Sequence, residues 1–446
     1  MIELRGKRFT CCDGVRRRDF LRAGFLGLGG LTLSQLLRYR AQAASQGRPA
    51  PATSVIFVEL AGGPPQHETY DPKPQAPSEF RGMYGVAQTN VPGVIFSDRM
   101  PQQAQVMDKL AVIRSLHHDS GSHQTSAHLT QTGYYLRDRQ NRDNEMPCAG
   151  SMVAKLRGAN APGVPSYVAI PRVMRFGDAA WLGHGYNAFA TGGDPNNKRF
   201  QVRNLTLAGG LNELRISDRR QLLRSLDDSS RLLDTGGVAE SVDDFTRQAF
   251  QIVAGERARE AFDLEREDST TRDAYGRATV GQSMLLARRL VEAGATFVTV
   301  RAGGWDMHWD LDERMARSGA PFDQGVAALV NDLYERGLDR DVLVVAMGEF
   351  GRTPRMNDGR GEGTPGRDHW GNLMSVMLSG GGLPVGQVIG ASNPKGEVPS
   401  QAPYRPENVL AMVYRHLGID PARTFPDHSG RPRFLLEERG LINELV

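Results

Sequence analysis

Short apolar runs that alternate with amphipathic stretches constrain this chain more than any other feature of its sequence. Five runs are rich in β-branched and aliphatic residues: SVIFVEL (54–60), KLAVIRSL (109–116), ATFVTV (295–300), DVLVVAM (341–347) and LMSVMLSG (373–380). Such nearly continuous apolarity is typical of strands in a parallel sheet that is covered on both faces. The sequence therefore predicts a mostly parallel central sheet.

Helical patterns lie between and after these runs. VGQSMLLARRLVEAG (280–294) and FDQGVAALVNDLYERG (322–337) each place apolar residues on one face and end at a glycine, which is favoured just past a helix C-terminus. RPENVLAMVYRHLG (405–418) has proline in its first turn and glycine at its end. Strands that alternate with helices predict an α/β protein with a doubly wound sheet. The charged stretch from about residue 198 to 271 is expected to form a helical insertion.

The N-terminus has the pattern of an export signal. RRRDFLRAGFLGLGGLTLSQLL (16–37) places paired arginines before a modest apolar segment, and AQA (41–43) supplies small residues for cleavage. The Arg-Arg-x-Phe-Leu pattern is similar to the twin-arginine type, which would carry the protein to the periplasm or beyond. An uncleaved anchor is disfavoured because the apolar run is short, glycine-rich and followed by Arg38. We expect cleavage after residue 43, which leaves a single domain, 44–446, with no stable membrane span.

The charge argues against a nucleic-acid-binding protein, and the cysteine content argues against a disulfide-stabilised domain. The formal net charge is +3 and no long basic tract follows the N-terminus, so nucleic acid is a poor candidate partner. Cys148 is the only cysteine after the expected cleavage site, so core packing and not a disulfide must stabilise the domain.

Polar residues gather beside the ends of the predicted strands. They lie in AGGPPQHETYDPKP (61–74), HHDSGSHQTSAHLTQTG (117–133), GWDMH (304–308), GEFGRTP (348–354) and GRDHWGN (366–372). In open α/β sheets, ligands bind beyond the carboxyl ends of the strands, so these segments are expected to converge.

The carboxylates and imidazoles in these segments predict a divalent metal site. Asp306 and His308 can supply two ligands and His369 a third, which leaves a position open for water or substrate. Zinc is the expected ion; manganese, iron, calcium and magnesium are alternatives, although the last two prefer all-oxygen shells. Such an ion would acidify bound water and polarise an ester oxygen, and Arg352 could bind an oxyanion. The alternative interpretation is a set of unrelated polar turns, one of them capped by Asp368.

The motifs also occur together, in this order, in a known family. AGGPPQHETYDPKP, IRSLHHDSGSHQTSAHLTQTG, GWDMH, GEFGRTP and GRDHW extend over almost the whole mature chain, which resembles the exported bacterial family called domain of unknown function 1501. That family is similar to the alkaline phosphatase and sulfatase superfamily. The resemblance therefore implies a three-layer α/β/α sandwich of the alkaline phosphatase type, with a metal site at the strand ends, and a sulfatase-like function.

The resemblance also implies roles for individual residues. Asp306, His308 and His369 resemble the ligands of one metal, with Asp368 beside them. Glu349 stands where the superfamily has the aspartate of an Asp-His pair for a second metal, and the histidine of that pair is replaced by Phe350.

The expected nucleophile is also replaced. Sulfatases place Cys, Ser or Thr ten residues before the glycine of a Thr-Gly pair, and here that position is His123, with Ser122 adjacent. Histidine can act as a ligand, base or nucleophile, and the sequence most easily permits direct attack by activated water. Glu68, His128 and Arg352 are expected to contact the substrate.

These observations leave two main functional hypotheses. The first is an exported metal-dependent hydrolase that acts on sulfate or phosphate esters of a small molecule or polysaccharide. The second is a catalytically degenerate sulfatase-like fold that binds carbohydrate or a partner; Phe350 and the missing hydroxyl at position 123 favour it. A metal-dependent isomerase or phosphomutase is a weaker third hypothesis, because phosphorylated metabolites are mainly cytoplasmic.

Overall fold

Eight strands form a central sheet in the computed structural model, which describes residues 52–202, 256–427 and 429–446. The strands lie in the order β12-β4-β11-β8-β1-β7-β5-β6. Their bounds are β1 Ser54–Leu60, β4 Leu110–Leu116, β5 Tyr167–Ile170, β6 Phe189–Ala190, β7 Phe297–Ala302, β8 Val342–Met347, β11 Met374–Gly380 and β12 Gln387–Ile389. Each of the five predicted runs forms a strand of this sheet.

One strand, β11, runs against the others. It pairs antiparallel with both β4 and β8, whereas β8, β1, β7, β5 and β6 are parallel to one another and β12 is parallel to β4. The prediction of a mostly parallel sheet is confirmed. Because β11 is reversed, the connection from β8 to β11, residues 348–373, begins and ends at one edge of the sheet. The carboxyl ends of β1, β4 and β7 lie at the same edge, since Met374 pairs with Leu116 and Glu59 with both Arg301 and Met347.

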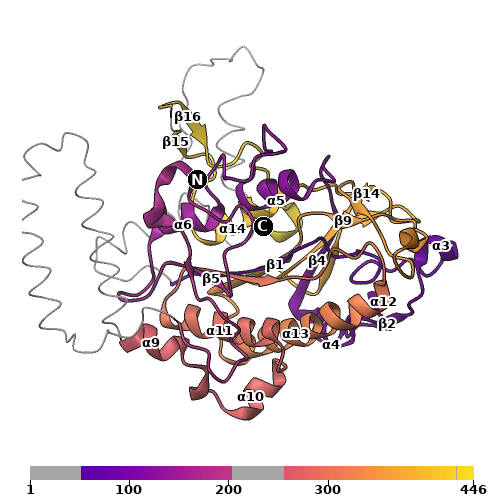
Figure 1. Cartoon of the computed structure of the whole chain (residues 1–446), viewed down its shortest axis with the longest axis horizontal. Coiled ribbons are helices and arrows are strands. Elements are labelled where there is room, and N and C mark those ends of the chain that lie inside the picture. The colour runs from indigo at the N-terminus through magenta and orange to yellow at the C-terminus, as the bar shows by residue number, and fades with distance from the viewer. Residues whose placement is uncertain (1–51, 203–255, 428) are drawn as a thin grey trace, which may run out of the picture. The chain divides into compact units, whose positions relative to one another are not determined.

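Helices cover both faces of the sheet, as Figure 1 shows. Alternate residues of β1 face opposite layers: Ile56 and Val58 pack with α11 (Thr279–Ala293) and α13 (Ala320–Glu335), and Val55 and Phe57 pack with α6 (Ala149–Arg157) and α14 (Pro406–His416). Period-two alternation in a strand with both faces buried gives the continuous apolar run seen in the sequence. The predicted three-layer α/β/α sandwich is confirmed.

Shorter elements complete the described part of the chain. The remaining helices are α3 Ser78–Arg81, α4 Pro101–Ala104, α5 His123–Thr132, α9 Glu256–Phe262, α10 Ser269–Ala274 and α12 Leu311–Arg314. Four two-stranded ladders pair β2 Val86–Gln88 with β3 Ile95–Ser97, β9 Gly351–Arg352 with β10 His369–Trp370, β13 Ala391–Ser392 with β14 Pro399–Gln401, and β15 Thr424–Pro426 with β16 Pro432–Phe434.

Two of the sequence predictions fall on parts of the chain outside the described residues. These are the signal peptide and most of the helical insertion at 198–271. Of that insertion the structure describes residues 198–202 and 256–271, which contain α9 and the beginning of α10. Within the described ranges, no helix combines the length and apolar character needed to cross a bilayer.

Candidate metal centre

Loops from several strands meet at the sheet edge where the parallel strands end. Asp306 and His308 follow β7, His123 begins α5 after β4, and His369 lies in β10, where it pairs with Arg352 of β9. The Arg367 amide donates to the Met307 carbonyl at 2.9 Å, which joins the two segments that carry these side chains. The motifs predicted to converge do so.

Gly62 allows the loop after β1 to approach this corner closely. Its φ is +116°, in the region that favours glycine, and a Cβ at this position would lie 2.3 Å from the backbone nitrogen of Asp306. The Gly62 amide donates to both carboxylate oxygens of Glu349, at 3.0 Å each. A larger residue at position 62 would therefore displace Asp306 and Glu349.

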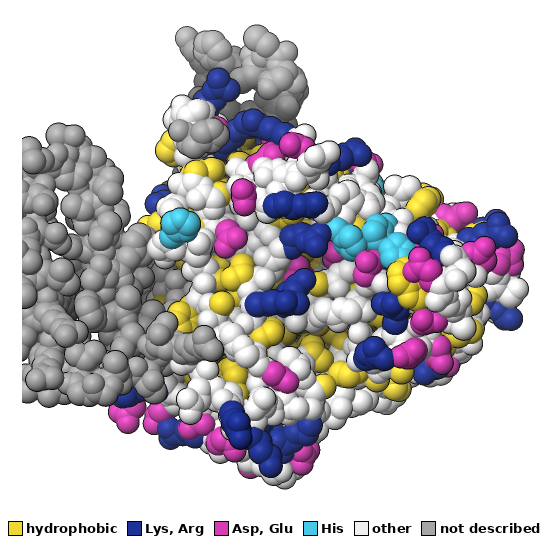
Figure 2. Space-filling model, viewed as in Figure 1, with side chains coloured by type: hydrophobic (Ala, Val, Ile, Leu, Met, Phe, Trp, Pro, Cys, Tyr) yellow, Lys and Arg dark blue, Asp and Glu magenta, His cyan; other side chains and the backbone are white. Residues whose placement is uncertain are grey.

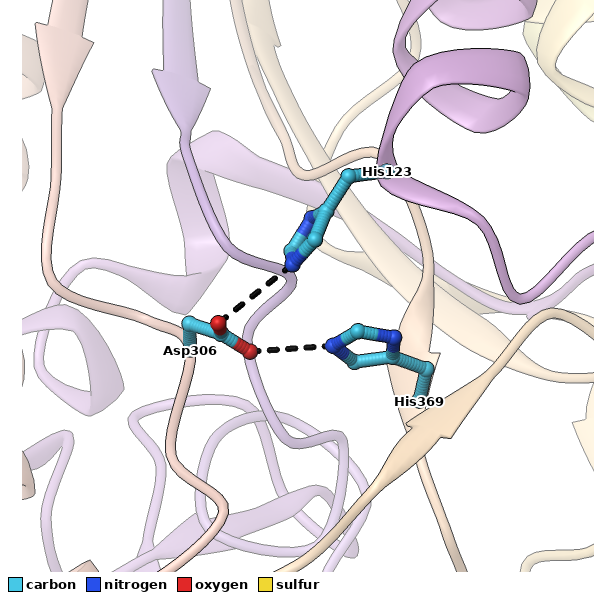
Figure 3. A group of neighbouring side chains, drawn as sticks. All are labelled: His123, Asp306 and His369. Carbon is cyan, nitrogen blue, oxygen red and sulfur yellow. Dashed lines mark hydrogen bonds and ion pairs between the residues drawn. The ribbon is translucent and has the colours of Figure 1, made fainter. Parts of the chain in front are cut away.

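Three imidazoles direct their Nε2 atoms at the carboxylate of Asp306. Nε2 of His308 and of His369 each lie 3.0 Å from Asp306 Oδ1, and the two Nε2 atoms are 2.9 Å apart. His123 Nε2 lies 3.3 Å from the other oxygen, Oδ2. Figure 3 shows His123 and His369 approaching the two oxygens of Asp306 from different sides.

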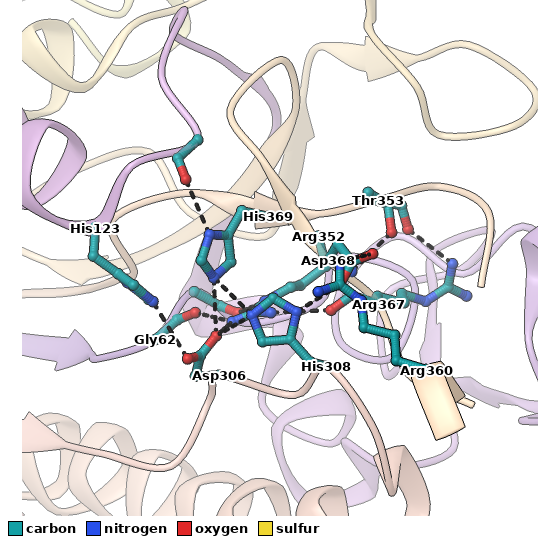
Figure 4. Close-up of polar contacts among 12 residues, drawn as sticks. Gly62, His123, Asp306, His308, Arg352, Thr353, Arg360, Arg367, Asp368 and His369 are labelled. Atoms are coloured by element: carbon teal, nitrogen blue, oxygen red, sulfur yellow. Dashed lines mark hydrogen bonds and ion pairs between the residues drawn. The ribbon is translucent and has the colours of Figure 1, made fainter. Parts of the chain in front are cut away.

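The opposite ring nitrogen of each imidazole contacts an oxygen acceptor. Nδ1 of His308 lies 2.6 Å from Asp368 Oδ1, that of His369 3.0 Å from the Gly121 carbonyl, and that of His123 2.7 Å from Glu349 Oε1. A proton on Nδ1 satisfies each of these contacts and leaves the lone pair on Nε2. The resulting network surrounds Asp306 in Figure 4.

This arrangement fits a divalent metal ion. Nε2 lone pairs that face each other and a carboxylate repel unless a cation or proton lies among them. In the tetrahedral geometry of zinc, bonds of about 2.1 Å place the ligand atoms about 3.4 Å apart. Asp306 Oδ1 and the Nε2 atoms of His308 and His369 are 2.9–3.0 Å apart, so they would separate by about 0.4 Å around the ion. The group His123, Asp306 and His369 also has ligand atoms within 4.8 Å of one another. Asp306, His308 and His369 could therefore hold an ion, with His123 on its open side.

The charges of the site shift the pKa values of His123 and Asp306, among others. Burial lowers the pKa of His123, but hydrogen bonds and charge interactions with Asp306 and Glu349 outweigh that effect and raise the pKa to about 9. Burial raises the pKa of Asp306, but hydrogen bonds from His123, His369 and Arg352 hold it well below its ordinary value. Asp306 is therefore a carboxylate, the form that binds metal.

Arg352 holds the carboxylate of Asp306 through a hydrogen bond. Its side chain is fully buried and donates from Nη2 to Asp306 Oδ1 at 2.5 Å, from Nε to the Gly63 carbonyl at 3.0 Å and from Nη1 to the Arg367 carbonyl at 3.0 Å. The sequence suggested Arg352 for binding an oxyanion. In the structure its guanidinium orients the carboxylate.

A pocket of about 180 Å³ opens beside this corner. It is lined by His123, Asp306 and Glu349, by the small residues Ala61, Gly62 and Ala127, and by three charged residues that the sequence did not single out as site residues, Glu59, Arg175 and Arg301. Glu59 and Arg301 are charged residues at the ends of otherwise apolar strands, a signal that could have revealed them. Arg175 carries no comparable signal. Figure 2 shows histidine side chains exposed on one face with Lys or Arg side chains next to them.

The other predicted site residues do not line the pocket; one of them contacts a possible metal ligand and the rest lie elsewhere. Asp368 accepts from His308 and pairs with Arg360 at 2.7 Å. Glu68 is fully buried against Arg367, at 2.8 Å. His128 is fully buried and contacts the Tyr134 carbonyl at 2.6 Å, and Ser122 Oγ donates to Gln124 at 3.2 Å. Glu68, His128 and Ser122 are not among the residues that line the pocket.

Comparisons with known proteins give one family and several solved structures. The family model described as "Protein of unknown function (DUF1501)" matches residues 52–446. The chain is similar to the PsFucS1 sulfatase from Pseudoalteromonas sp., with 12% identity over 87% of this chain and 72% of that one and a TM-score of 0.41. It is similar to Ps i-CgsB in complex with k-i-k-neocarrahexaose (11%, 82% and 72%, 0.39) and to alkaline phosphatase from the Antarctic bacterium TAB5 (11%, 82% and 98%, 0.35). No curated protein matches the chain in sequence.

Proposed function

Because the chain belongs to the DUF1501 family, whose function its description leaves open, we propose an activity from the chemistry of the site: metal-dependent hydrolysis of sulfate or phosphate esters. Zinc is the proposed ion, because imidazole and carboxylate ligands suit it. The proposed substrate is an ester of a small molecule or polysaccharide outside the cytoplasm, in keeping with the twin-arginine pattern of the N-terminus.

The observation that carries the proposal is the convergence of imidazole Nε2 atoms on Asp306. Each Nδ1 contacts an oxygen, and such contacts orient histidine ligands in metal sites. A divalent ion bound there supplies a Lewis acid that polarises the ester and makes water more acidic.

The pocket beside the centre suits one anionic group. Drug-sized ligands occupy pockets of about 300 Å³ or more, so about 180 Å³ accommodates a single ester head and its nearest atoms. Arg175 and Arg301 line this space and can donate hydrogen bonds to sulfate or phosphate oxygens.

His123 is the residue proposed for proton transfer. Glu349 accepts from its Nδ1 at 2.7 Å, and Glu349 is itself held by the Gly62 amide. His123 lines the pocket, and because its pKa is raised to about 9 it carries a proton at neutral pH that its Nε2 can give to the leaving alcohol. Glu349 acts in this scheme as a positioning residue.

Metal analysis together with an ester panel tests the proposal. Purified mature protein should contain stoichiometric metal and hydrolyse at least one of p-nitrophenyl sulfate, p-nitrophenyl phosphate and bis(p-nitrophenyl) phosphate. Asp306→Asn and His369→Ala should lose metal and turnover together, and His184→Gln, in the short 3₁₀ helix His184–Tyr186, should keep both. Metal content that is low and unchanged by these substitutions would refute the proposal.

Phe350 favours a second candidate function, a carbohydrate- or partner-binding module without turnover. Its fully buried ring packs against His369 and His123, with centroid distances of 4.5 and 5.0 Å. An apolar wall thus occupies the place expected for a second-metal histidine. Binding of a sulfated glycan that persists after chelation, with no ester turned over, would support this alternative.

A further inference from the structure

A glycine-rich loop, residues 357–366, lies against His308 and connects the polar motifs GEFGRTP and GRDHWGN of the sequence. The two ends of the loop are joined, because the Asn357 amide donates to the Gly366 carbonyl at 2.9 Å. Gly366 lets the loop approach closely, since a Cβ at this position would lie 2.3 Å from the carbonyl carbon of His308. The loop is therefore fixed to the backbone of a residue that could bind the metal.

The side-chain amide of Asn357 hydrogen-bonds on one side to the loop and on the other to the metal centre. Its Oδ1 accepts from the amides of Gly359 at 2.9 Å and Gly366 at 3.0 Å. Its Nδ2 donates to the His308 carbonyl at 2.8 Å and, more weakly, to Asp368 Oδ1 at 3.4 Å. A primary amide has two N–H donors and two lone pairs, and all are used here. Asn357 thus sets the carboxylate of Asp368 relative to the backbone of His308.

Arg360, in the same loop, holds the second oxygen of that carboxylate. Its Nη2 lies 2.7 Å from Asp368 Oδ2, whereas Oδ1 contacts His308 Nδ1 at 2.6 Å, and Figure 4 shows these three side chains together. The φ of Arg360 is +54°, and Gly359 and Gly361 on either side have φ of +79° and +73°. A non-glycine residue keeps this unfavourable conformation only where its surroundings maintain it. The loop therefore holds Arg360 in a defined position beside Asp368.

We propose that loop 357–366 is a positioning loop for the metal centre. Asn357 and Arg360 fix the two oxygens of Asp368, and Asp368 in turn fixes the ring of His308 with its Nε2 toward Asp306. A ligand that is already oriented loses less conformational freedom when the ion binds, so the loop should increase metal affinity. This inference rests on the proposed function, because His308 is one of the proposed metal ligands.

Charge and position make opposite predictions for two substitutions. Asn357→Asp replaces the amide NH2 by an oxygen, so the side chain can no longer donate to His308 or Asp368 and gains a negative charge. Arg360→Met removes a positive charge together with the contact to Asp368. Each change makes the surroundings of the centre more negative, which by Coulomb attraction alone would tighten the binding of a cation. Weaker metal binding by a folded variant is therefore the sign of lost positioning.

Competition with a chromophoric chelator at pH 8 measures the dissociation constant for Zn²⁺. Asn357→Asp should weaken binding by about 10-fold or more and Arg360→Met by about 3-fold, because Arg360 is one contact further from His308. Two matched controls should keep the wild-type value: Asn197→Asp, the same change at an exposed turn, and Arg317→Met, which breaks an exposed pair with Glu313. Circular dichroism establishes that each variant is folded.

A second measurement needs no metal. In the metal-free protein labelled with ¹⁵N-histidine, the Nδ1 proton of His308 is assigned by its absence in His308→Gln. It should give a downfield signal in the wild type, because its bond to Asp368 is short. The signal should shift upfield in Asn357→Asp, where Asp368 is released, and stay in place in Asn197→Asp.

The outcomes separate this inference from the proposed function. Zinc binding by folded Asn357→Asp that equals or exceeds wild-type binding would overturn the positioning loop and leave the hydrolase intact. If Asn357→Asp does not fold, Arg360→Met, whose side chain is half exposed, decides by the same criterion. A wild type that binds no zinc would refute the hydrolase; an upfield shift of the His308 signal in the variant would then support the loop, and an unchanged signal would overturn it.

Discussion

The buried pair Glu68–Arg367 gives the sharpest prediction about how the centre is held. Both side chains are fully buried, and Arg367 contacts the carboxylate through Nε at 2.9 and 3.1 Å and through Nη2 at 2.8 Å. Glu68→Gln keeps the shape but removes the charge, so the guanidinium keeps only carbonyl partners. Breaking one side of a buried ion pair costs about 3–5 kcal/mol of unfolding free energy, and we expect the lower half of this range because a glutamine oxygen can still accept.

Urea unfolding of the metal-free protein, followed by tryptophan fluorescence, measures this loss. The double variant Glu68→Met with Arg367→Met should recover most of it, because no charge remains buried. Glu313→Gln, which breaks an exposed pair with Arg317, should change the free energy by less than about 1 kcal/mol. Substrate binding that is lost in Glu68→Gln at unchanged stability would refute this reasoning and would support the role in substrate contact expected from the sequence.

Three further predictions address the site and its support. In Gly366→Ala a Cβ would lie 2.3 Å from the His308 carbonyl carbon, so metal affinity should fall about 10–100-fold in a chelator competition assay, whereas Gly303→Ala, with no atom within 4 Å of the new Cβ, should keep it. In the metal-free protein the raised pKa of His123, about 9, should contribute stability that is complete below about pH 6.5 and lost as the pH rises through 9; a melting profile from pH 6 to 10 that is the same in His123→Gln would contradict this. Tyr70→Phe removes a buried 2.6 Å hydrogen bond to Gln103 and should cost about 1–3 kcal/mol in urea unfolding, and a loss no larger than that of Tyr84→Phe, whose hydroxyl bond is exposed, would refute it.

The sequence was sufficient for the strands of the sheet but not for all their directions. The apolar runs predicted β1, β4, β7, β8 and β11 to within two residues at either end, because strands with two buried faces must be continuously apolar. The reversal of β11 left no local trace, since an antiparallel strand in a covered sheet has the same composition. Short strands such as β5, with four residues, are too brief for a pattern to form.

The same distinction applies to the site. Asp306, His308 and His369 could be predicted to converge because each lies in a polar motif next to a strand end. The ion pair of Glu68 could not be predicted, since its partner Arg367 is 299 residues away and nothing local to either residue identifies the pair. Residue type shows that a charge is present; only the fold shows whether another side chain neutralises it.

The reversed strand β11 lets one continuous segment supply several residues of the centre from a single edge of the sheet. The excursion from 348 to 373 supplies Glu349, Arg352, Asp368 and His369 without once crossing the sheet. Insertions or deletions in such a segment would leave the pairing of the eight-stranded sheet unchanged. The buried side chains of Arg352 and Arg367 bond to Gly63, Asp306 and Glu68 outside the segment, so a change in its chemistry would require matching changes in the loop after β1.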